Sequence, residues 1–412
     1  MKSLEETKVL LEKYNQSHLL SFYNELNDNE KEDLLKQIES IDFELILGLF
    51  NNKDKYEKSD DVIEPIKYID KLKLSSDEIE KYSKIGEQCI KNGEYAFATL
   101  AGGQGTRLGH PGPKGTFKLG INPDKSLFEI MCDSLKNARK EYGVYINWYI
   151  MTSRENNDDT VNFFEDNNYF GYPKEKVTFF IQGELPMVDE NGKIILEQKG
   201  KIKLAADGHG GIFEAMYKNN IINDMKSKGI KWCFIGGIDN VLLKMVDPIL
   251  VGVAISNNTL IASKSIVKAS PNEKVGVFCK RNNKPSVIEY SEISDDMAHM
   301  CDENGELIYG ESHILCNLFN IEALEKVGDI KLPIHIAHKK CSYIDELGIQ
   351  VTPIAPNVYK FETFMFDAFN IFDDITVLRV LREEEFAPIK NKEGIDSPDT
   401  ARWLYKQHWE IE

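Results

Sequence analysis

The hydrophobic positions of the first ninety or so residues follow a helical period. Residues 4–14 and 29–42 space leucine and isoleucine three and four apart among charged side chains. A polar stretch with a proline follows near residue 60, and the segment SSDEIEKY (75–82) then carries the signal that begins a helix. The pattern predicts a helical N-terminal region over residues 1–93, with no chemistry of its own.

From residue 94 the pattern changes to short apolar runs that alternate with helical stretches. The runs are rich in β-branched and aromatic residues and cover 95–101, 144–153, 176–183 and 231–240. The helical stretches between them cover 126–142, 159–167 and 211–229. This alternation predicts an α/β fold with a mostly parallel sheet that is covered on both faces. Ligands of such sheets bind at the carboxyl ends of the strands, where we expect the site.

After residue 260 the pattern favours antiparallel strands joined by tight turns. We expect strands within 260–270, 273–294 and 305–311, and helices over 319–327 and 366–378. Residues 94–330 are therefore predicted to form one α/β domain that carries the expected site. Residues 331–412 are predicted to form a short C-terminal α+β part that completes that site.

Composition narrows the classes of function. The net charge of −17 and the absence of a dense Lys/Arg stripe argue against a nucleic-acid partner, while they leave room for a small phosphorylated substrate and for Mg²⁺. No run approaches the ~20 apolar residues that cross a bilayer, and the first residues are too charged for a signal peptide. Seven scattered cysteines without a C-x-x-C pair indicate reduced thiols, so we expect a cytoplasmic protein without a membrane partner.

The segment TLAGGQGTRLGHPGPKG (99–115) carries the strongest chemical signal. Glycines bring backbone N–H groups close to a ligand, and a glycine-rich turn after a strand suits phosphate. Leu108 stands where the dinucleotide fingerprint needs its third glycine, and Lys114 follows Pro113 where the Walker pattern needs G-K-[ST]. A plain glycine turn is the alternative, but Arg107 and the Pro-Lys pair favour a phosphate loop of another kind.

The loop LAGGQGTRLG…PK resembles the signature of nucleotidyltransferases that make nucleoside-diphosphate sugars. The stretches VTFFIQGELP, GGIDNVL, KFETFMFDAF, LREEEFAPIKN and SPDTAR resemble the UDP-N-acetylglucosamine pyrophosphorylase branch of the UDP-sugar pyrophosphorylase family, from about residue 17 to 402. The resemblance implies a Rossmann-like, glycosyltransferase-A-like fold with a mixed sheet. It also implies uridylyltransferase activity, in which UTP and N-acetylglucosamine 1-phosphate give UDP-N-acetylglucosamine and pyrophosphate. The phosphate oxygen attacks the α-phosphorus in line, so no nucleophilic side chain or general base is needed.

The resemblance also implies roles for individual residues. For UTP, these are the backbone at Leu100, Ala101, Gly102 and Gly103, with Gln182 at the uracil edge, Gly208 near the base, and Lys114, Asp239 and Lys360 at the phosphates. Arg107 would stabilise the departing pyrophosphate, and Lys390 would hold the sugar phosphate, so Arg107, Lys114 and Lys390 are the implied catalytic residues. Asp239 would hold Mg²⁺, with Mn²⁺ as the alternative ion.

For the sugar, the resemblance implies Glu289 and Tyr290 at the hydroxyls, Asn317 nearby and His209 facing the ring. The acetylated-sugar branch has Asp-Gly-Asn-Gly-Gly where this chain has Asp207-Gly208-His209-Gly210-Gly211. An imidazole there resembles relatives that use plain hexoses, so glucose or galactose 1-phosphate stays the alternative substrate. Outside this class, the alternatives are a nicotinamide dehydrogenase, which Leu108 disfavours, and a UDP-sugar sensor that has lost catalysis, which the retained cations and Asp239 disfavour.

Overall fold

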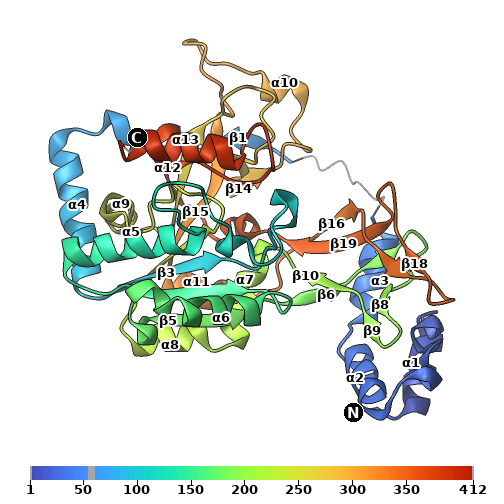
Figure 1. The fold of residues 1–412 in the computed structure, drawn as a ribbon. Coiled ribbons are helices and arrows are strands. Elements are labelled where there is room, and N and C mark those ends of the chain that lie inside the picture. The colour runs from blue at the N-terminus through green and yellow to red at the C-terminus, as the bar shows by residue number, and fades with distance from the viewer. Residues whose placement is uncertain (1, 54–60, 411–412) are drawn as a thin grey trace. The chain divides into compact units, whose positions relative to one another are not determined.

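The computed structural model describes residues 2–53 and 61–410, which form two compact units (Figure 1). Unit 1 combines Met1–Asp60, Gly183–Gly211 and Leu332–Phe364, and unit 2 combines Asp61–Gln182, Ile212–Lys331 and Met365–Glu412. The units therefore cut across the three consecutive parts expected from the sequence. Among the described residues, no helix combines the length and the apolarity that a bilayer crossing requires.

Unit 2 is built on a mixed sheet whose strands are mostly parallel. Its central path runs in the order β2-β20-β12-β15-β11-β3-β4-β5. Strands β11, β3, β4 and β5 are mutually parallel, β12, β20 and β2 are parallel to one another, and β15 runs antiparallel to β11 and β12. Their bounds are Ile69–Asp70 (β2), Tyr95–Leu100 (β3), Asn147–Thr152 (β4), Val177–Ile181 (β5), Trp232–Gly237 (β11), Ile261–Val267 (β12), Glu311–Asn320 (β15) and Thr376–Arg379 (β20). The expected α/β class and mixed sheet are confirmed.

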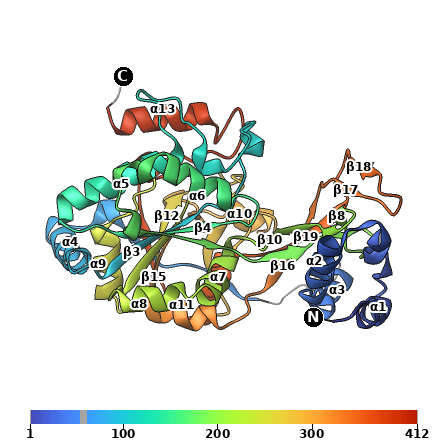
Figure 2. The ribbon, with the colours of Figure 1, turned by 60° about the horizontal axis from the view of Figure 1, so that its bottom comes forward.

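Helices cover both faces of this sheet (Figure 2). On one face lie α5 (Leu127–Tyr142) and α6 (Asn157–Asp166), and on the other lie α7 (Ile212–Lys218), α8 (Ile221–Ser227) and α11 (Ile321–Gly328). Strand β4 shows why: the indole of Trp148 packs 5.3 Å from Phe164 of α6, while the hydroxyl of Tyr149 donates to Asp224 of α8 at 2.7 Å. Alternate residues of one buried strand thus serve two opposite cores.

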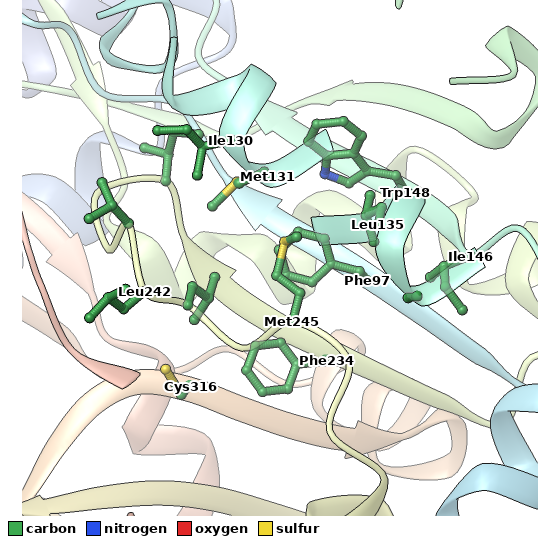
Figure 3. Close-up of a cluster of buried hydrophobic side chains, with 14 of the residues drawn as sticks. Phe97, Ile130, Met131, Leu135, Ile146, Trp148, Phe234, Leu242, Met245 and Cys316 are labelled. Carbon is green, nitrogen blue, oxygen red and sulfur yellow. The ribbon is translucent and has the colours of Figure 1, made fainter. Parts of the chain in front are cut away.

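The larger core of unit 2 lies between the sheet and α4 (Ser76–Lys91), α5 and α9 (Pro248–Ser256). Figure 3 shows its centre, where Phe97 of β3 and Phe234 of β11 meet Met131 and Leu135 of α5 and the side chain of Met245. The predicted helix at 75–82 is confirmed, because Ser75 caps α4 with a reciprocal hydrogen bond to Glu78. Because this core packs against both β3 and β11, it holds in place the edge of the sheet at which these two strands end.

The second half of unit 2 departs from the predicted elements in several places. The segment 273–294 does contain a hairpin, β13 (Val277–Arg281) with β14 (Lys284–Ile288), and β13 also pairs with β1 (Ile63–Pro65). Strand β12 joins β15 and β20 instead of a sequence neighbour, and 305–311 makes only one isolated bridge before β15 begins. The helix predicted over 211–229 is broken at Asn220, whose φ is +60°.

The C-terminal part of unit 2 is also shorter in helix than predicted. The helix expected over 366–378 is wrong: Met365–Ile371 is a 3₁₀ turn and 376–379 is strand β20. The turn packs its aromatic rings, with Phe369 stacked on Phe278, and the β-branched end of the segment extends beside β12. Three further helices are α10 (Asp295–Ala298), α12 (Arg382–Glu385) and α13 (Pro398–His408).

Unit 1 joins the N-terminal helices to short strands from two distant segments. Helices α1 (Leu4–Lys13), α2 (Asp28–Glu39) and α3 (Phe43–Asn51) confirm the first part of the helical region predicted over 1–93. The prediction is wrong for the short strands β1 and β2, which lie in the same region and join the sheet of unit 2. Their buried Leu34, Ile38 and Phe43 share a core with Val188, Ile202 and Phe361. The strands are β6 (Glu184–Pro186) with β10 (Leu204–Ala206); β7 (Val188–Asp189), β19 (Val358–Thr363) and β16 (Ile334–Lys339); and β9 (Lys201–Ile202), β8 (Leu196–Gln198), β17 (Tyr343–Ile344) and β18 (Gln350–Val351).

Candidate functional site

The glycine-rich loop leaves the carboxyl end of β3 and folds back on itself. The N–H of Gly105 donates to the carbonyl of Gly112 at 2.8 Å, and that of Lys114 donates to the carbonyl of Gly103 at 3.0 Å. These bonds close the loop into a compact turn with two short 3₁₀ segments, Thr106–Leu108 and Lys114–Thr116. The loop therefore has a defined shape without help from regular secondary structure.

A buried asparagine from the next strand connection holds this loop. The Nδ2 of Asn156 donates to the carbonyl of Ala101 at 2.9 Å and to that of Gly103 at 3.3 Å. Among the described residues of unit 2, the N–H groups of Gly102 and Gly103 donate to no backbone carbonyl. Carbonyls tied down on one side and N–H groups left for a ligand are the arrangement that an anion requires.

Sequence reasoning missed Asn156. Its only local signal is the turn Ser153-Arg154-Glu155-Asn156, in which the Ser153 N–H donates to the asparagine Oδ1 at 2.9 Å and the Asn156 N–H donates to the serine hydroxyl at 3.3 Å. That pattern predicts a turn and says nothing of a glycine loop that begins 55 positions earlier.

Gln182 lies against the bare backbone of Gly102. A Cβ at Gly102 would stand 2.1 Å from the Gln182 Oε1, a distance that no side chain could occupy without displacing the amide. The backbone N–H of Gln182 donates to the carbonyl of Thr152 at 2.9 Å, which extends the β4–β5 pairing by one step. The structure therefore brings the predicted uracil-reading amide and the glycine loop together at one sheet edge.

Two of the predicted charged residues meet at the same edge. The Nζ of Lys114 lies 3.5 Å from an Oδ of Asp239, which follows β11, and both side chains are partly buried. The guanidinium of Arg107 is exposed, and no carboxylate pairs with it in the part of the chain that the structure describes. Strands β11 and β3 are adjacent and parallel, so their following loops place the carboxylate beside the glycine loop.

Lys390 lies in the segment that pairs with the Asp239 loop. The N–H of Ile389 donates to the backbone carbonyl of Asp239 at 2.8 Å. The Lys390 ammonium is 46% exposed and lies 3.7 Å from Asp396. The backbone pairing thus places Lys390 one residue after the contact with the Asp239 loop.

The residues predicted for the sugar differ in their accessibility. Asn317 is fully buried in β15, where its Oδ1 accepts from the Ser263 hydroxyl at 2.6 Å and its Nδ2 lies 3.1 Å from the sulfur of Met365. Glu289 follows the end of β14 and is half-buried, and Tyr290 is 49% exposed.

Leu100, which was predicted for UTP, is the buried last residue of β3 and contributes its backbone to the sheet edge.

The remaining predicted residues, Gly208, His209 and Lys360, belong to unit 1. Gly208 has a φ of +89°, and a Cβ there would stand 2.3 Å from the carbonyl of Thr363. The imidazole of His209 stacks on Phe364 at 5.4 Å, and the imidazole of His335 stacks on the same ring at 4.4 Å. Lys360 of β19 donates to Glu362 at 2.8 Å.

Comparison with known proteins identifies the family to which the chain belongs. The sequence model of the UTP–glucose-1-phosphate uridylyltransferase family matches residues 47–397. The chain belongs to this family. It is 34% identical to the UDP-N-acetylglucosamine pyrophosphorylase of Saccharomyces cerevisiae over 97% of this chain and 89% of the yeast protein. It is 36% identical to UDP-N-acetylhexosamine pyrophosphorylase-like protein 1 of Xenopus tropicalis over 99% of this chain and 84% of that protein.

A solved structure of the family has the same fold. The crystal structure of the uridine diphosphate N-acetylglucosamine pyrophosphorylase from Trypanosoma brucei in complex with an inhibitor superimposes with a TM-score of 0.81 at 31% identity. The match covers 98% of this chain and 85% of the trypanosome chain. The resemblance drawn from the sequence motifs is therefore confirmed: the chain is a nucleotidyltransferase of the UDP-sugar pyrophosphorylase family. That membership leaves the nicotinamide dehydrogenase alternative without support.

Proposed function

We propose that this protein joins UTP to N-acetylglucosamine 1-phosphate and releases UDP-N-acetylglucosamine and pyrophosphate. The observation that carries the proposal is the convergence at one sheet edge of the glycine loop, Gln182 and the Lys114–Asp239 pair, in a chain of this family. The relatives named for this reaction match over nearly the whole chain.

The proposed reaction asks mainly for orientation and charge neutralisation. The sugar phosphate oxygen attacks the α-phosphorus of UTP, and the bond to the β-phosphate breaks as pyrophosphate leaves. At ~4 Å, two unit charges repel by about 4 kcal/mol at an effective dielectric constant near 20. The backbone N–H groups of Gly102 and Gly103, the Arg107 guanidinium and the ammonium groups of Lys114 and Lys390 are proposed to supply the compensating donors.

Gln182 gives the site a means of recognising uracil. Its amide can both donate and accept hydrogen bonds, as the edge of uracil requires. Because the amide lies directly against the backbone of Gly102, it is held next to the glycine loop. Gly208 and Lys360 of unit 1 are proposed to serve the base and the phosphates, respectively. Glu289, Tyr290 and Asn317 are proposed to serve the sugar.

Mg²⁺ is the proposed cofactor, with Mn²⁺ as a substitute. The described residues contain no group of three His, Cys, Asp or Glu side chains that could hold a metal alone. The partly exposed carboxylate of Asp239 fits the way Mg²⁺ usually binds, through one or two carboxylates together with substrate phosphates. When bound, such an ion would neutralise phosphate charge, and Lys114 would share Asp239 with it.

A cytoplasmic location is proposed on the state of the thiols. All seven cysteines are free, and burial raises the pKa of Cys89, Cys132 and Cys316 to about 12, which keeps these thiols protonated and unreactive.

A specific observation keeps a plain hexose 1-phosphate as the second candidate substrate. His209 stacks on Phe364, so its position is fixed by an aromatic contact, and an imidazole presents fewer hydrogen-bonding groups than the asparagine amide of the acetylated-sugar branch. Pyrophosphate release from UTP should therefore be measured with the 1-phosphates of N-acetylglucosamine, N-acetylgalactosamine, glucose and galactose. The highest kcat/KM with N-acetylglucosamine 1-phosphate would support the first proposal, and the highest with glucose 1-phosphate the second. If UTP binds but no sugar phosphate reacts, the chain acts as a UDP-sugar sensor instead.

A further inference from the structure

Asn240 is a buried residue that joins two separate segments of unit 2. It follows Asp239 directly, and 4% of its surface is exposed. Its Nδ2 donates to the carbonyl of Glu385 at 2.7 Å, and its Oδ1 accepts from the N–H of Ala387 at 2.9 Å. The same Oδ1 also accepts a hydrogen bond, at 3.2 Å, from the N–H of Leu242 in its own loop. One amide therefore fastens the loop after β11 to the segment that precedes Lys390.

The backbones of the two segments are paired on either side of this amide. The N–H of Val241 donates to the carbonyl of Ala387 at 3.2 Å, and the N–H of Ile389 donates to the carbonyl of Asp239 at 2.8 Å. Asp239 and Lys390 therefore stand on two segments that are paired through the isolated bridge between Asn240 and Pro388. A displacement of either segment would be passed to the other through these bonds.

The segment before Lys390 is itself anchored in the core by a buried ion-pair network. The carboxylate of Glu385, which is 2% exposed, accepts from the buried ammonium of Lys264 and from Lys71. Lys264 also lies 2.8 Å from Asp247, the residue that caps α9. The amide of Asn240 thus links the loop after β11 to a segment that Glu385 anchors in the core.

We infer that Asn240 is a positioning residue that holds the proposed nucleotide carboxylate, Asp239, and the proposed sugar-phosphate ammonium, Lys390, at a constant separation. This inference rests on the proposed function for the roles of those two residues. It goes beyond that proposal because Asn240 is buried and its amide is bonded to backbone groups of the chain. Misplacement of reacting groups by about 1 Å costs about 100-fold in rate, so the loss of this amide should be felt in catalysis as well as in stability.

The test is a double-mutant cycle in the 412-residue protein. Asn240→Ala should lower kcat/KM for the sugar 1-phosphate by about 100-fold, and Lys390→Ala should lower it by a similar factor. If Asn240 acts by placing Lys390, the second substitution should cost less than ~3-fold in the Asn240→Ala background, because the effects of residues coupled through a shared backbone shift are not additive. Asn147→Ala is the matched control, since Asn147 is a buried asparagine at the amino end of β4, away from the site. That variant should keep its kcat/KM whatever it loses in melting temperature.

A second measurement separates this inference from the proposed function. Hydrogen exchange at residues 386–391 and 238–243 should become at least ~10-fold faster in Asn240→Ala, while exchange in α5 stays unchanged. Unchanged protection in both segments would overturn the inference even if the protein proved inactive with every sugar phosphate. Fully additive losses in the cycle would overturn it in an active protein. Inactivity of the wild-type protein alone would count against the proposed function only.

Discussion

Arg107 offers the sharpest prediction at the scale of single residues. Its exposed guanidinium has no carboxylate partner among the described residues, so its charge is available to the leaving pyrophosphate. Arg107→Ala should lower kcat by at least ~100-fold, the scale seen when a preorganised donor to developing charge is removed. Steady-state pyrophosphate release measures this. Arg139→Ala on α5, where the guanidinium lies over Tyr145, is the control and should leave kcat unchanged. Equal turnover of Arg107→Ala and the wild-type protein would contradict the proposed role.

Gly102 makes a second prediction at this scale, because its missing side chain leaves room for Gln182. In Gly102→Ala the new Cβ would meet the Gln182 Oε1 at 2.1 Å, so the amide must turn away. UTP affinity, measured by calorimetry, should fall about 10-fold, and the variant should behave like Gln182→Ala. Gly103→Ala is the comparison, since a Cβ at Gly103 would meet no atom of the described residues within 4 Å. This substitution should leave the melting temperature unchanged. Wild-type UTP affinity in Gly102→Ala would disprove the link between the two residues.

These residues show what could and could not be predicted from the sequence at this scale. Gly102, Arg107 and Lys114 lie in one short motif whose chemistry is local, so the motif suffices to find them. Asn156 and Asn240 act on backbone groups 55 and 145 positions away, and nothing near them in the chain marks that role. Their function exists only after the strands have assembled.

Elements were predicted well where a single signal decides them. Strands β3, β4 and β11 are buried along their whole length, and such continuous apolar runs flanked by helices identify a parallel sheet. The segment 366–378 failed because its spacing suits a helix, while the assembled protein needs Thr376–Arg379 beside β12. Tertiary pairing overrode the local preference there. Apart from β16 and β19, the strands described in unit 1 have two or three residues each, too few for any period to be read.

The buried ion-pair network gives a prediction at the scale of elements, because Lys264 joins β12 to the start of α9 and to α12. Burial opposes charge on these groups, yet the attraction between them outweighs it, so the pKa of Lys264 is raised and that of Asp247 is lowered. Lys264→Met should lower the free energy of unfolding at pH 7.5 by about 3–5 kcal/mol, since two carboxylates stay buried with less compensation. Urea titration measures the loss. Lys84→Met, which removes an exposed pair with Glu80 on α4, should cost less than about 1 kcal/mol.

The same variant has a predicted dependence on pH. Without Lys264, burial should raise the pKa of Asp247 in the folded state above the ordinary value of about 3.9. A carboxyl whose pKa is higher in the folded state binds a proton more readily there, so folding gains stability as the pH falls through that raised value. The difference in unfolding free energy between wild type and Lys264→Met should therefore shrink from pH 7.5 to pH 5. A difference that is constant over this range would show that the carboxylates are not the source of the loss.

At the scale of the whole molecule, the division into units could not be predicted from the order of the chain. The sequence pattern suggested three consecutive parts, but unit 1 draws on three segments that are separated by more than a hundred residues. The reason is the core that the N-terminal helices build with β7, β8, β9 and β19. The pattern of an amphipathic helix predicts that one of its faces will be buried, but it does not predict which strands will cover that face.

The two cores consist of different residues, and that separation predicts how the protein responds to damage. Leu34 of α2 and Leu135 of α5 are both fully buried, the first in the core of unit 1 and the second in that of unit 2. Each substitution to alanine should cost about 2–5 kcal/mol through lost burial and the cavity left behind. Hydrogen exchange followed by mass spectrometry should then show faster exchange in α1–α3 and β19 for Leu34→Ala, with β3 and β11 unchanged, and the reverse for Leu135→Ala. The pair of leucines serves as a reciprocal control, because the chemical change is identical and only the core differs. Faster exchange throughout the chain in both variants would mean that the units unfold as one cooperative body. If exchange in unit 2 stays slow while unit 1 exchanges faster, the glycine loop, Asp239 and Lys390 keep their arrangement when the part of the chain that carries His209 and Lys360 does not.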